Sequence, residues 1–285
     1  MVKNIQTIYR DSMRRHRFGY ALYEPVPFER LRPGMLGHLD EYQRWHPILD
    51  LTDATAVEAA GYTAVGYLQS NGPDTRRWGP LAASDVSASS VELEAGAGAA
   101  VLGLPVDLGG ALSFSTAGGA GAVLMCDDDV VSEGFDFRDP FLVWLKQNAR
   151  LLFAKYPDLK KHGVCVATWT YSSEDIHISV WESGEHSVAV GFNVGVPGTG
   201  EAGPRTSWFR GHASSGWSAW TGQKRVVFFT GVKVRVGILG GTKEQREKDW
   251  RGGDQTFIVE DDKHGNDYKA EAELFGDDWY DISDD

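Results

Sequence analysis

Three sets of residues in this sequence have types and spacings that catalysis or ligand binding would use. Residues 198–203, GTGEAG, have the glycine spacing of a dinucleotide-binding turn, but Pro204 and the Ser- and Trp-rich run behind it predict a loop and a strand where a helix must receive the pyrophosphate. The acidic run 127–129 could attract a divalent cation, although further oxygen ligands at calcium-loop spacing are missing. A nucleophilic or metal site could combine Cys165 with His177, His186 or His212.

None of these sets forms a complete catalytic motif. Phosphate-loop, zinc-protease and nucleophile-elbow signatures are absent from the sequence. Separated histidines in strand-rich sequence are more often polar core or surface residues than ligands, and an acidic run is more often a solvated turn. We therefore expect no catalytic residues, no metal and no cofactor. The alternative, a hydrolase that uses Cys165 and a histidine, requires an activity that disappears in Cys165→Ala.

Composition describes a core-forming chain. Its 285 residues, 42% of them apolar, suffice for one large or two small domains, and a net charge of -12 argues against a nucleic-acid partner. Apolar runs stay far below the roughly 18 residues of a spanning helix, and the N-terminus lacks the apolar part of a secretory signal. Two cysteines and no N-glycosylation sequence fit a reducing compartment, so we expect the chain in the cytosol.

Charge is distributed unevenly along the chain. Residues 241–285 hold 15 acidic and 6 basic side chains, whereas residues 1–33 hold 7 basic and 3 acidic ones. Residues 5–17 have apolar side chains three to four apart with arginines on another face, which predicts a short basic amphipathic helix. Such a helix either lies on an anionic membrane or forms an ordinary solvated surface, and the composition alone fits both.

Alternating strands dominate the sequence between 91 and 124. Odd positions are apolar from 91 to 101, a turn follows at 103–105, and even positions are then apolar from 106 onward, less regularly to 124. This pattern predicts a long Gly-rich hairpin with one apolar face. Such a segment could change shape, or its small residues could pack against a helix. The apolar positions are Val91, Leu93, Val101, Val106, Leu108, Leu112 and Phe114.

The second half repeats strands after one helix. Asp139-Pro140 opens a predicted amphipathic helix that ends near Tyr156-Pro157. A strand at 164–169, a second long hairpin from 176 to 196 that turns through 182–185, and a closing strand at 226–236 follow. We also expect a strand-like segment at 62–68 and a turn at 71–74. The alternating apolar positions of the second hairpin include Ile176, Ile178, Val180, Val188, Val190 and Phe192.

The fold class that follows is α+β, a twisted and mainly antiparallel sheet with flanking helices. Residues 1–240 form the predicted main domain. Beyond Ile238, Leu239, Gly240 and Gly241 the composition becomes a charged tail with small apolar clusters, too few for a core of its own. The tail could dock on the main domain or stay solvated.

The order of these elements resembles the gasdermin pore-forming domain, and the sequence is similar to the short fungal gasdermins that execute cell death in nonself recognition. The resemblance covers residues 1–240 through diffuse motifs: 91–96, 164–168, 176–180 and 227–234. It implies a gasdermin N-terminal-domain-like fold and a cytoplasmic inactive form. Once released, that form would bind acidic phospholipids of a plasma or organelle membrane, assemble with its own copies into a large ring and convert the two hairpins into membrane-spanning strands.

The resemblance also implies roles for individual residues. By region, the basic first helix corresponds to the lipid-contacting helix of the family, through Lys3, Arg10, Arg14, Arg15 and Arg17. The membrane-inserting residues would be the alternating apolar positions of the two hairpins. The strands have the length and the one-sided pattern that a membrane requires, and open sheet edges would be removed in a ring of many subunits.

The sequence departs from the animal gasdermins at its end, because the large helical inhibitory domain is absent and only residues 241–285 follow the last strand. We expect this tail to inhibit pore formation by masking the basic N-terminal segment or a sheet edge. Two routes could release the tail: proteolysis around 238–241, or an encounter with a variant gasdermin-like partner. The alternative function is a binding module that uses Trp208, Trp217 and Trp220 for a protein or carbohydrate, without membrane activity.

Overall fold

The computed structural model describes residues 5–91, 110–182, 184–193, 207–210, 217–237, 255–259 and 268–276. It has an α+β fold with few helices and a mostly antiparallel sheet, as predicted. The chain forms two compact units. Unit 1 contains Met1–His16, Arg76–Val130 and Ser173–Lys224, and unit 2 contains Arg17–Thr75, Val131–Ser172 and Arg225–Asp285. Two long strands contribute to both units: β10 (Val164–Trp181) and β13 (Trp217–Gly237).

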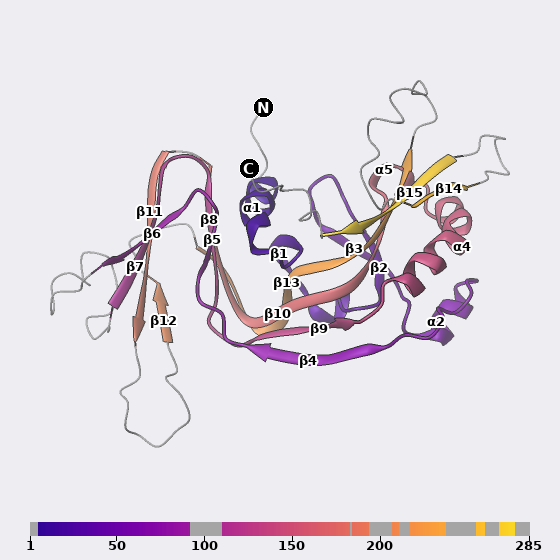
Figure 1. Ribbon diagram of the computed structural model, residues 1–285, viewed down its shortest axis with the longest axis horizontal. Coiled ribbons are helices and arrows are strands. Elements are labelled where there is room, and N and C mark those ends of the chain that lie inside the picture. The colour runs from indigo at the N-terminus through magenta and orange to yellow at the C-terminus, as the bar shows by residue number, and fades with distance from the viewer. Residues whose placement is uncertain are drawn as a thin grey trace, which may run out of the picture. The chain divides into compact units, whose positions relative to one another are not determined.

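Unit 2 is built on a sheet with the strand order β14-β15-β13-β10-β2-β3, and β1 pairs with β13 while β9 pairs with β10 and β4 (Figure 1). Short helical segments connect the strands. The elements are β1 (Tyr20–Pro27), η2 (Phe28–Arg30), β2 (Met35–Leu39), β3 (Trp45–Asp50), α2 (Ala54–Ala59), β4 (Ser70–Arg76), β9 (Val130–Phe135), α4 (Asp139–Lys155), α5 (Leu159–His162), β14 (Gln255–Val259) and β15 (Tyr268–Phe275).

The helix α4 was correctly predicted at both ends. Pro140 occupies its first turn, where a missing N–H costs nothing, and Tyr156 leaves the helical conformation before Pro157. Its apolar side chains pack on one face of the unit 2 sheet together with residues of α2, β2, β10, β13, β14 and β15. The helix residues in this core are Phe141, Trp144, Leu145, Ala149, Leu152 and Phe153.

A second core cluster of unit 2 is built from other residues of the same strands. On β10, Val164 and Val166 belong to the α4 cluster, while the alternate residues Cys165 and Ala167 belong to the second one. Since alternate residues of a strand point to opposite faces, the sheet is covered on both sides. The strands also approach closely here, because a side chain at Gly231 would collide with the carbonyl of Val166.

Unit 1 holds α1 (Ile5–Met13), η1 (Arg14–His16), β5 (Leu81–Ala82), β6 (Ser87–Val91), β7 (Gly110–Gly118), β8 (Gly121–Cys126), β11 (Gly184–Asn193) and β12 (Ser207–Arg210). The strand β8 is buried along its whole length and pairs with β5 and with β10. The predicted helix at 5–17 is confirmed as α1 followed by the 3-10 turn η1. It contacts β8 and buries Ile8, Tyr9 and Met13.

A separate four-stranded sheet in unit 1 has the order β12-β11-β7-β6, and Figure 1 shows these four strands side by side. The predicted first hairpin is present in part, since β6 and β7 pair antiparallel with Val91 opposite Ala111. The residues between them, including Leu93, Val101, Val106 and Leu108, lie outside the described residues.

The second predicted hairpin is wrong in its pairing. The strands β10 and β11 follow one another in the chain but belong to different sheets, and among the described pairings β11 pairs with β7 and β12. The predicted pieces at 164–169 and 176–180 are parts of one strand of 18 residues. In the second half of this strand, His177 and Ser179 are buried as well as the alternate residues Ile176 and Ile178.

Two local predictions in unit 2 are also wrong. Residues 71–74 do not form a turn but lie in β4, whose side chains are all exposed, as an edge strand containing Pro73 permits. Residues 62–68 are not a strand: they run along α4, where the Trp144 Nε1–H donates to Thr63 O at 2.6 Å and the Tyr62 ring meets the Trp144 ring.

Candidate functional site

The four-stranded sheet of unit 1 brings predicted residues of both hairpins onto one face. In the antiparallel register of β7 and β11, Phe114 lies opposite Val188 and Leu112 lies opposite Val190. Directly opposed residues share a face of the sheet, so four apolar residues from two distant parts of the sequence form one continuous patch. We call Leu112, Phe114, Val188 and Val190 the apolar face.

Two of the alternate positions of β7 are serines. Ser113 and Ser115 are half-buried and, by the two-residue period of a strand, occupy the opposite side from Leu112 and Phe114. The strands have 9 residues in β7 and 10 in β11. About 9–11 residues are needed for a tilted strand to cross a hydrocarbon layer. The strands β7 and β11 therefore have membrane-crossing length, and β7 places Leu112 and Phe114 on the side opposite Ser113 and Ser115.

The apolar face is covered in this conformation. Phe114 is 3% exposed, Val188 and Val190 are fully buried, and Leu112 is half-buried. Burial of each such side chain is worth roughly 1.5–3 kcal/mol. Any membrane-inserted form must therefore exchange these protein contacts for lipid contacts.

The register of β7 and β11 continues into β8 and β10 without a slip. Trp181 lies opposite Gly121, and three residues on, Gly184 lies opposite Gly118. The strands β7 and β8 thus pair with β11 and β10 as one ribbon in a single register, interrupted at 119–120 on one side and after Trp181 on the other. We call this interruption the bend.

Trp181 connects the two sides of the bend. Its ring lies against Gly121 of β8, where any side chain would overlap the ring. Its Nε1–H donates to Thr116 Oγ1 of β7 at 2.9 Å, and that hydroxyl donates to Gly119 O at 3.3 Å. One buried side chain therefore contacts both halves of the ribbon.

The predicted lipid-binding arginines occupy the end of α1 and the turn after it. Arg10 pairs with its neighbour Asp11 at 2.8 Å, whereas Arg14 and Arg15 are exposed on η1. Arg17 belongs to unit 2 and has a left-handed backbone, with φ of 58°. Lys3 lies outside the described residues. The structure therefore places Arg10, Arg14 and Arg15 at the C-terminal end of one short helical segment.

The remaining predicted membrane residues are placed only in part. Ile176, Ile178 and Val180 lie on β10 opposite β8, and Ile176 and Ile178 are fully buried. Val91 and Phe192 are placed by their backbones, which pair with Ala111 and Gly110. The predicted cleavage residues Ile238, Leu239, Gly240 and Gly241 lie outside the described residues.

The acidic tail contributes two strands to unit 2. The strand β15 pairs antiparallel with β13, Gly231 opposite Phe275 and Gly237 opposite Lys269, and β14 pairs with β15. Side chains of the tail also contact basic residues across this ladder: Arg235 Nε lies 2.7 Å from Glu273 Oε1, and the Lys233 ammonium lies 5.4 Å from the centre of the Phe275 ring. The tail therefore covers an edge of β13 and places a carboxylate beside Arg235.

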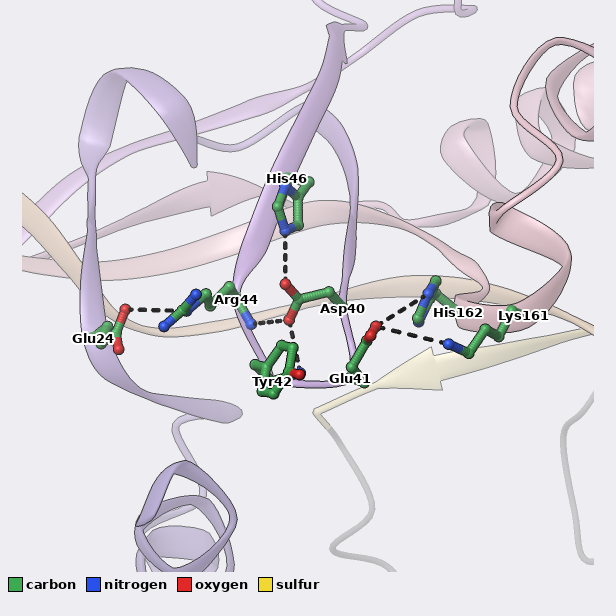
Figure 2. A network of polar contacts seen from close by, with 8 residues as sticks. All are labelled: Glu24, Asp40, Glu41, Tyr42, Arg44, His46, Lys161 and His162. Atoms are coloured by element: carbon green, nitrogen blue, oxygen red, sulfur yellow. Dashed lines mark hydrogen bonds and ion pairs between the residues drawn. The ribbon is translucent and has the colours of Figure 1, made fainter. Parts of the chain in front are cut away.

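Unit 2 also has a polar network at the β2–β3 turn (Figure 2). Asp40 Oδ1 accepts hydrogen bonds from the backbone N–H groups of Tyr42 and Arg44, and Asp40 Oδ2 lies 2.9 Å from His46 Nε2. Glu41 lies 3.5 Å from His162 Nε2 and 3.9 Å from Lys161 Nζ, and Arg44 lies 3.7 Å from Glu24. Burial raises the pKa of Asp40, but these hydrogen bonds outweigh it, so the pKa is lowered.

His38 lies next to this network. Its ring stacks on His46 at 5.0 Å and contacts His162 at 5.7 Å. Burial and then the two neighbouring histidines lower the pKa of His38. The neutral ring is therefore favoured in the folded protein.

The proposed combination of Cys165 with His177 finds no geometric support. Cys165 is buried in the second core cluster of unit 2, and burial raises its pKa to about 12. A thiol in this environment stays protonated and is a poor nucleophile. His177 belongs to unit 1, the backbone of His186 lies in β11, and His212 is outside the described residues.

One cluster joins two residues that sequence reasoning had considered separately. His177 Nε2 lies 2.6 Å from Asp175 Oδ1 and 3.5 Å from Asp127 Oδ2. Asp127 follows β8, and its N–H donates to the carbonyl of Asp175 on β10 at 2.9 Å. Asp175 was missed, although its spacing of two residues from His177 in a strand places both on one face.

The sequence matches no protein-family model and no curated protein. Within the part of the chain that the structure describes, none of the helices combines the length and apolar character needed to cross a membrane. Trp217 and Trp220, which a binding module would expose, are half-buried, and Trp208 lies in β12.

Proposed function

We propose that this protein is an autoinhibited, gasdermin-like pore-forming protein that binds acidic phospholipids, oligomerises and permeabilises a membrane to cause cell death. The observation that carries the proposal is the apolar face: two segments of different hairpins align their apolar residues in register over strands of membrane-crossing length. A binding module has no need of this arrangement. Self-association in a ring would pair the strand edges that one subunit leaves open.

The same proposal assigns a role to the tail. The strand β15 occupies an edge of β13 and places Glu273 against Arg235, so the tail supports the closed conformation through backbone pairing and charge. Release of residues 241–285, by proteolysis or by an encounter with a variant partner, would free this edge. The basic end of α1 would then contribute the attraction to anionic lipid, at about 1 kcal/mol for each basic residue near the surface.

A fluorophore on adjacent residues of β7 tests insertion directly. An environment-sensitive probe would be attached to Leu112→Cys or to the matched control Ser113→Cys, which lies one residue away on the other face. The native Cys126 and Cys165 are 2% and 1% exposed and should not be labelled in the folded protein. A protease site between Gly241 and Gln255 allows the tail to be cut after folding.

The cut protein should release dye that is trapped inside anionic vesicles. On the same vesicles, the probe at residue 112 should report a lipid environment and the probe at residue 113 should report water. Neutral vesicles should show neither change. Leakage without any difference between the two probes would disprove insertion of β7 as an amphipathic strand. A folded protein that has been cut and has lost residues 255–285, and that neither binds vesicles nor releases their dye, would favour the binding module instead.

A further inference from the structure

The cluster of Asp127, Asp175 and His177 has the composition of a metal-binding site. Among the described residues, it is the one group of three potential ligand residues whose ligand atoms all lie within 4.8 Å of one another. The side chain of His177 is 2% exposed, while those of Asp127 and Asp175 are 20% and 36% exposed. The nitrogen ligand is therefore buried, and the carboxylates lie between it and solvent.

The buried histidine lacks an ordinary hydrogen bond. Nε2 lies 2.6 Å from Asp175 Oδ1, yet neither of these buried atoms makes a hydrogen bond, which means that the contact is close without the alignment that an N–H donor requires. Burying an imidazole nitrogen without a partner costs about 1–3 kcal/mol. A cation held by the lone pairs of Nε2 and the carboxylate oxygens would satisfy both atoms at once.

We propose that Asp127, Asp175 and His177 bind a divalent transition-metal cation, with Zn²⁺ as the preferred ion. One imidazole nitrogen and two carboxylate oxygens are ordinary zinc ligands, and three protein ligands leave a position for water on the exposed side. Calcium and magnesium prefer six or more oxygen ligands and accept nitrogen poorly. The charge also fits, since two carboxylates balance a divalent cation.

This site is independent of the proposed membrane activity and has a structural consequence of its own. Asp127 follows β8, whereas Asp175 and His177 lie on β10, and the two strands pair from Gly121 opposite Trp181 to Cys126 opposite Ile176. A cation would therefore tie the two strands of the ribbon together at the end away from the bend. Binding to the folded state alone raises its stability.

Titration of the metal-free full-length protein with Zn²⁺ tests the proposal by calorimetry, and with Co²⁺ by its visible absorption. We expect one equivalent to bind, and a concentration of Zn²⁺ one hundred times the Kd to raise the melting temperature by about 5 °C. Asp175→Asn and Asp127→Asn keep the side-chain shape and should weaken binding at least about tenfold. His177→Gln should abolish the Co²⁺ absorption of a nitrogen ligand.

The chain offers matched controls. Asp128 and Asp129 are neighbouring exposed carboxylates outside the cluster, so Asp128→Asn and Asp129→Asn should bind Zn²⁺ like the unchanged protein. His46→Gln controls for zinc bound at the histidines of unit 2. Two results would overturn the proposal and leave an ion pair of His177 with two carboxylates. One is that the folded protein shows no saturable binding of Zn²⁺. The other is that binding survives Asp127→Asn and Asp175→Asn but is lost in His46→Gln.

Discussion

At the scale of single residues, the contact between Gly121 and Trp181 determines how the ribbon packs at the bend. The Trp181 ring occupies the space that a side chain at position 121 would need, and its Nε1–H is bonded to Thr116. A side chain at position 121 can be accommodated only if the buried Trp181 ring moves.

Gly121→Ala should therefore destabilise the protein by about 1–3 kcal/mol, as overpacking a dense core does. Gly119→Ala is the matched control, since no atom lies within 4 Å of the added methyl group. Urea unfolding followed by tryptophan fluorescence measures both variants. Equal stabilities of the two variants would contradict the contact.

Two half-buried histidines, His16 and His38, predict a dependence of stability on pH. Burial lowers the pKa of His16 and of His38 from the ordinary value of 6.5. Each ring takes up a proton more readily in the unfolded chain. Their contribution to stability is therefore complete above pH 6.5 and is lost as the pH falls through the lower folded values.

The free energy of unfolding should thus decrease between pH 8 and pH 5, measured by urea unfolding at each pH. The pKa values of Asp40 and Asp50 are lowered from 3.8, so these carboxylates change the free energy of unfolding only at more acidic pH. The double variant His16→Gln, His38→Gln should have a flatter profile. A profile unchanged by the double variant would exclude these two histidines as the cause.

At the scale of elements, α1 and the turn η1 differ in the burial of their side chains. Ile8, Tyr9 and Met13 are buried, while Arg14 and Arg15 stay exposed at its end. If these arginines attract the protein to lipid, their neutralisation should leave the fold intact.

Arg14→Gln and Arg15→Gln should each weaken the binding of the tail-cut protein to anionic vesicles about fivefold. Lys161→Gln removes a charge of similar exposure in unit 2, at 70%, and should leave binding unchanged. Vesicle sedimentation across a lipid titration provides the comparison. Equal loss in all three variants would show that only the net charge matters.

Elements with strong local signals could be predicted from the sequence. Asp139-Pro140 and Tyr156-Pro157 mark the ends of α4, and the periodic apolar residues mark α1 and β13. The pairing of β11 with β7 could not be predicted, because β7 lies some seventy residues away and alternation does not reveal which strand lies alongside. The Asp127–Asp175–His177 cluster depends on the same long-range pairing of β8 with β10.

At the scale of the whole molecule, the tail is part of the fold rather than an appendage. Its strands bury Val259, Ala270, Ala272 and Phe275 in the two core clusters of unit 2. Ending the chain at Gly240 removes these contacts as well as the acidic side chains of the tail.

The chain that ends at Gly240 should be less stable than the full chain by at least about 3 kcal/mol, since several apolar side chains lose their partners. The chain cut after folding should keep most of that stability while β15 stays paired. Thermal melting of the three forms distinguishes them. Equal melting temperatures for the truncated and full chains would contradict docking of β14 and β15.

Because the register is unbroken through the bend, odd- and even-numbered residues keep their sides of the ribbon along its whole length. Even-numbered residues of β7 lie opposite even-numbered residues of β11, as Leu112 does with Val190, and the same holds for β8 with β10. One residue inserted at Ala120, with β8 held in place, would exchange the two sides of β7 and put serines where Leu112 and Phe114 now lie. Two inserted residues would return each side chain to its present side of the sheet, but shifted by two positions, with Phe114 where Leu112 now lies and Thr116 where Phe114 now lies. Insertions of an odd number of residues in this segment should therefore reverse the two faces of β7, whereas insertions of an even number should not.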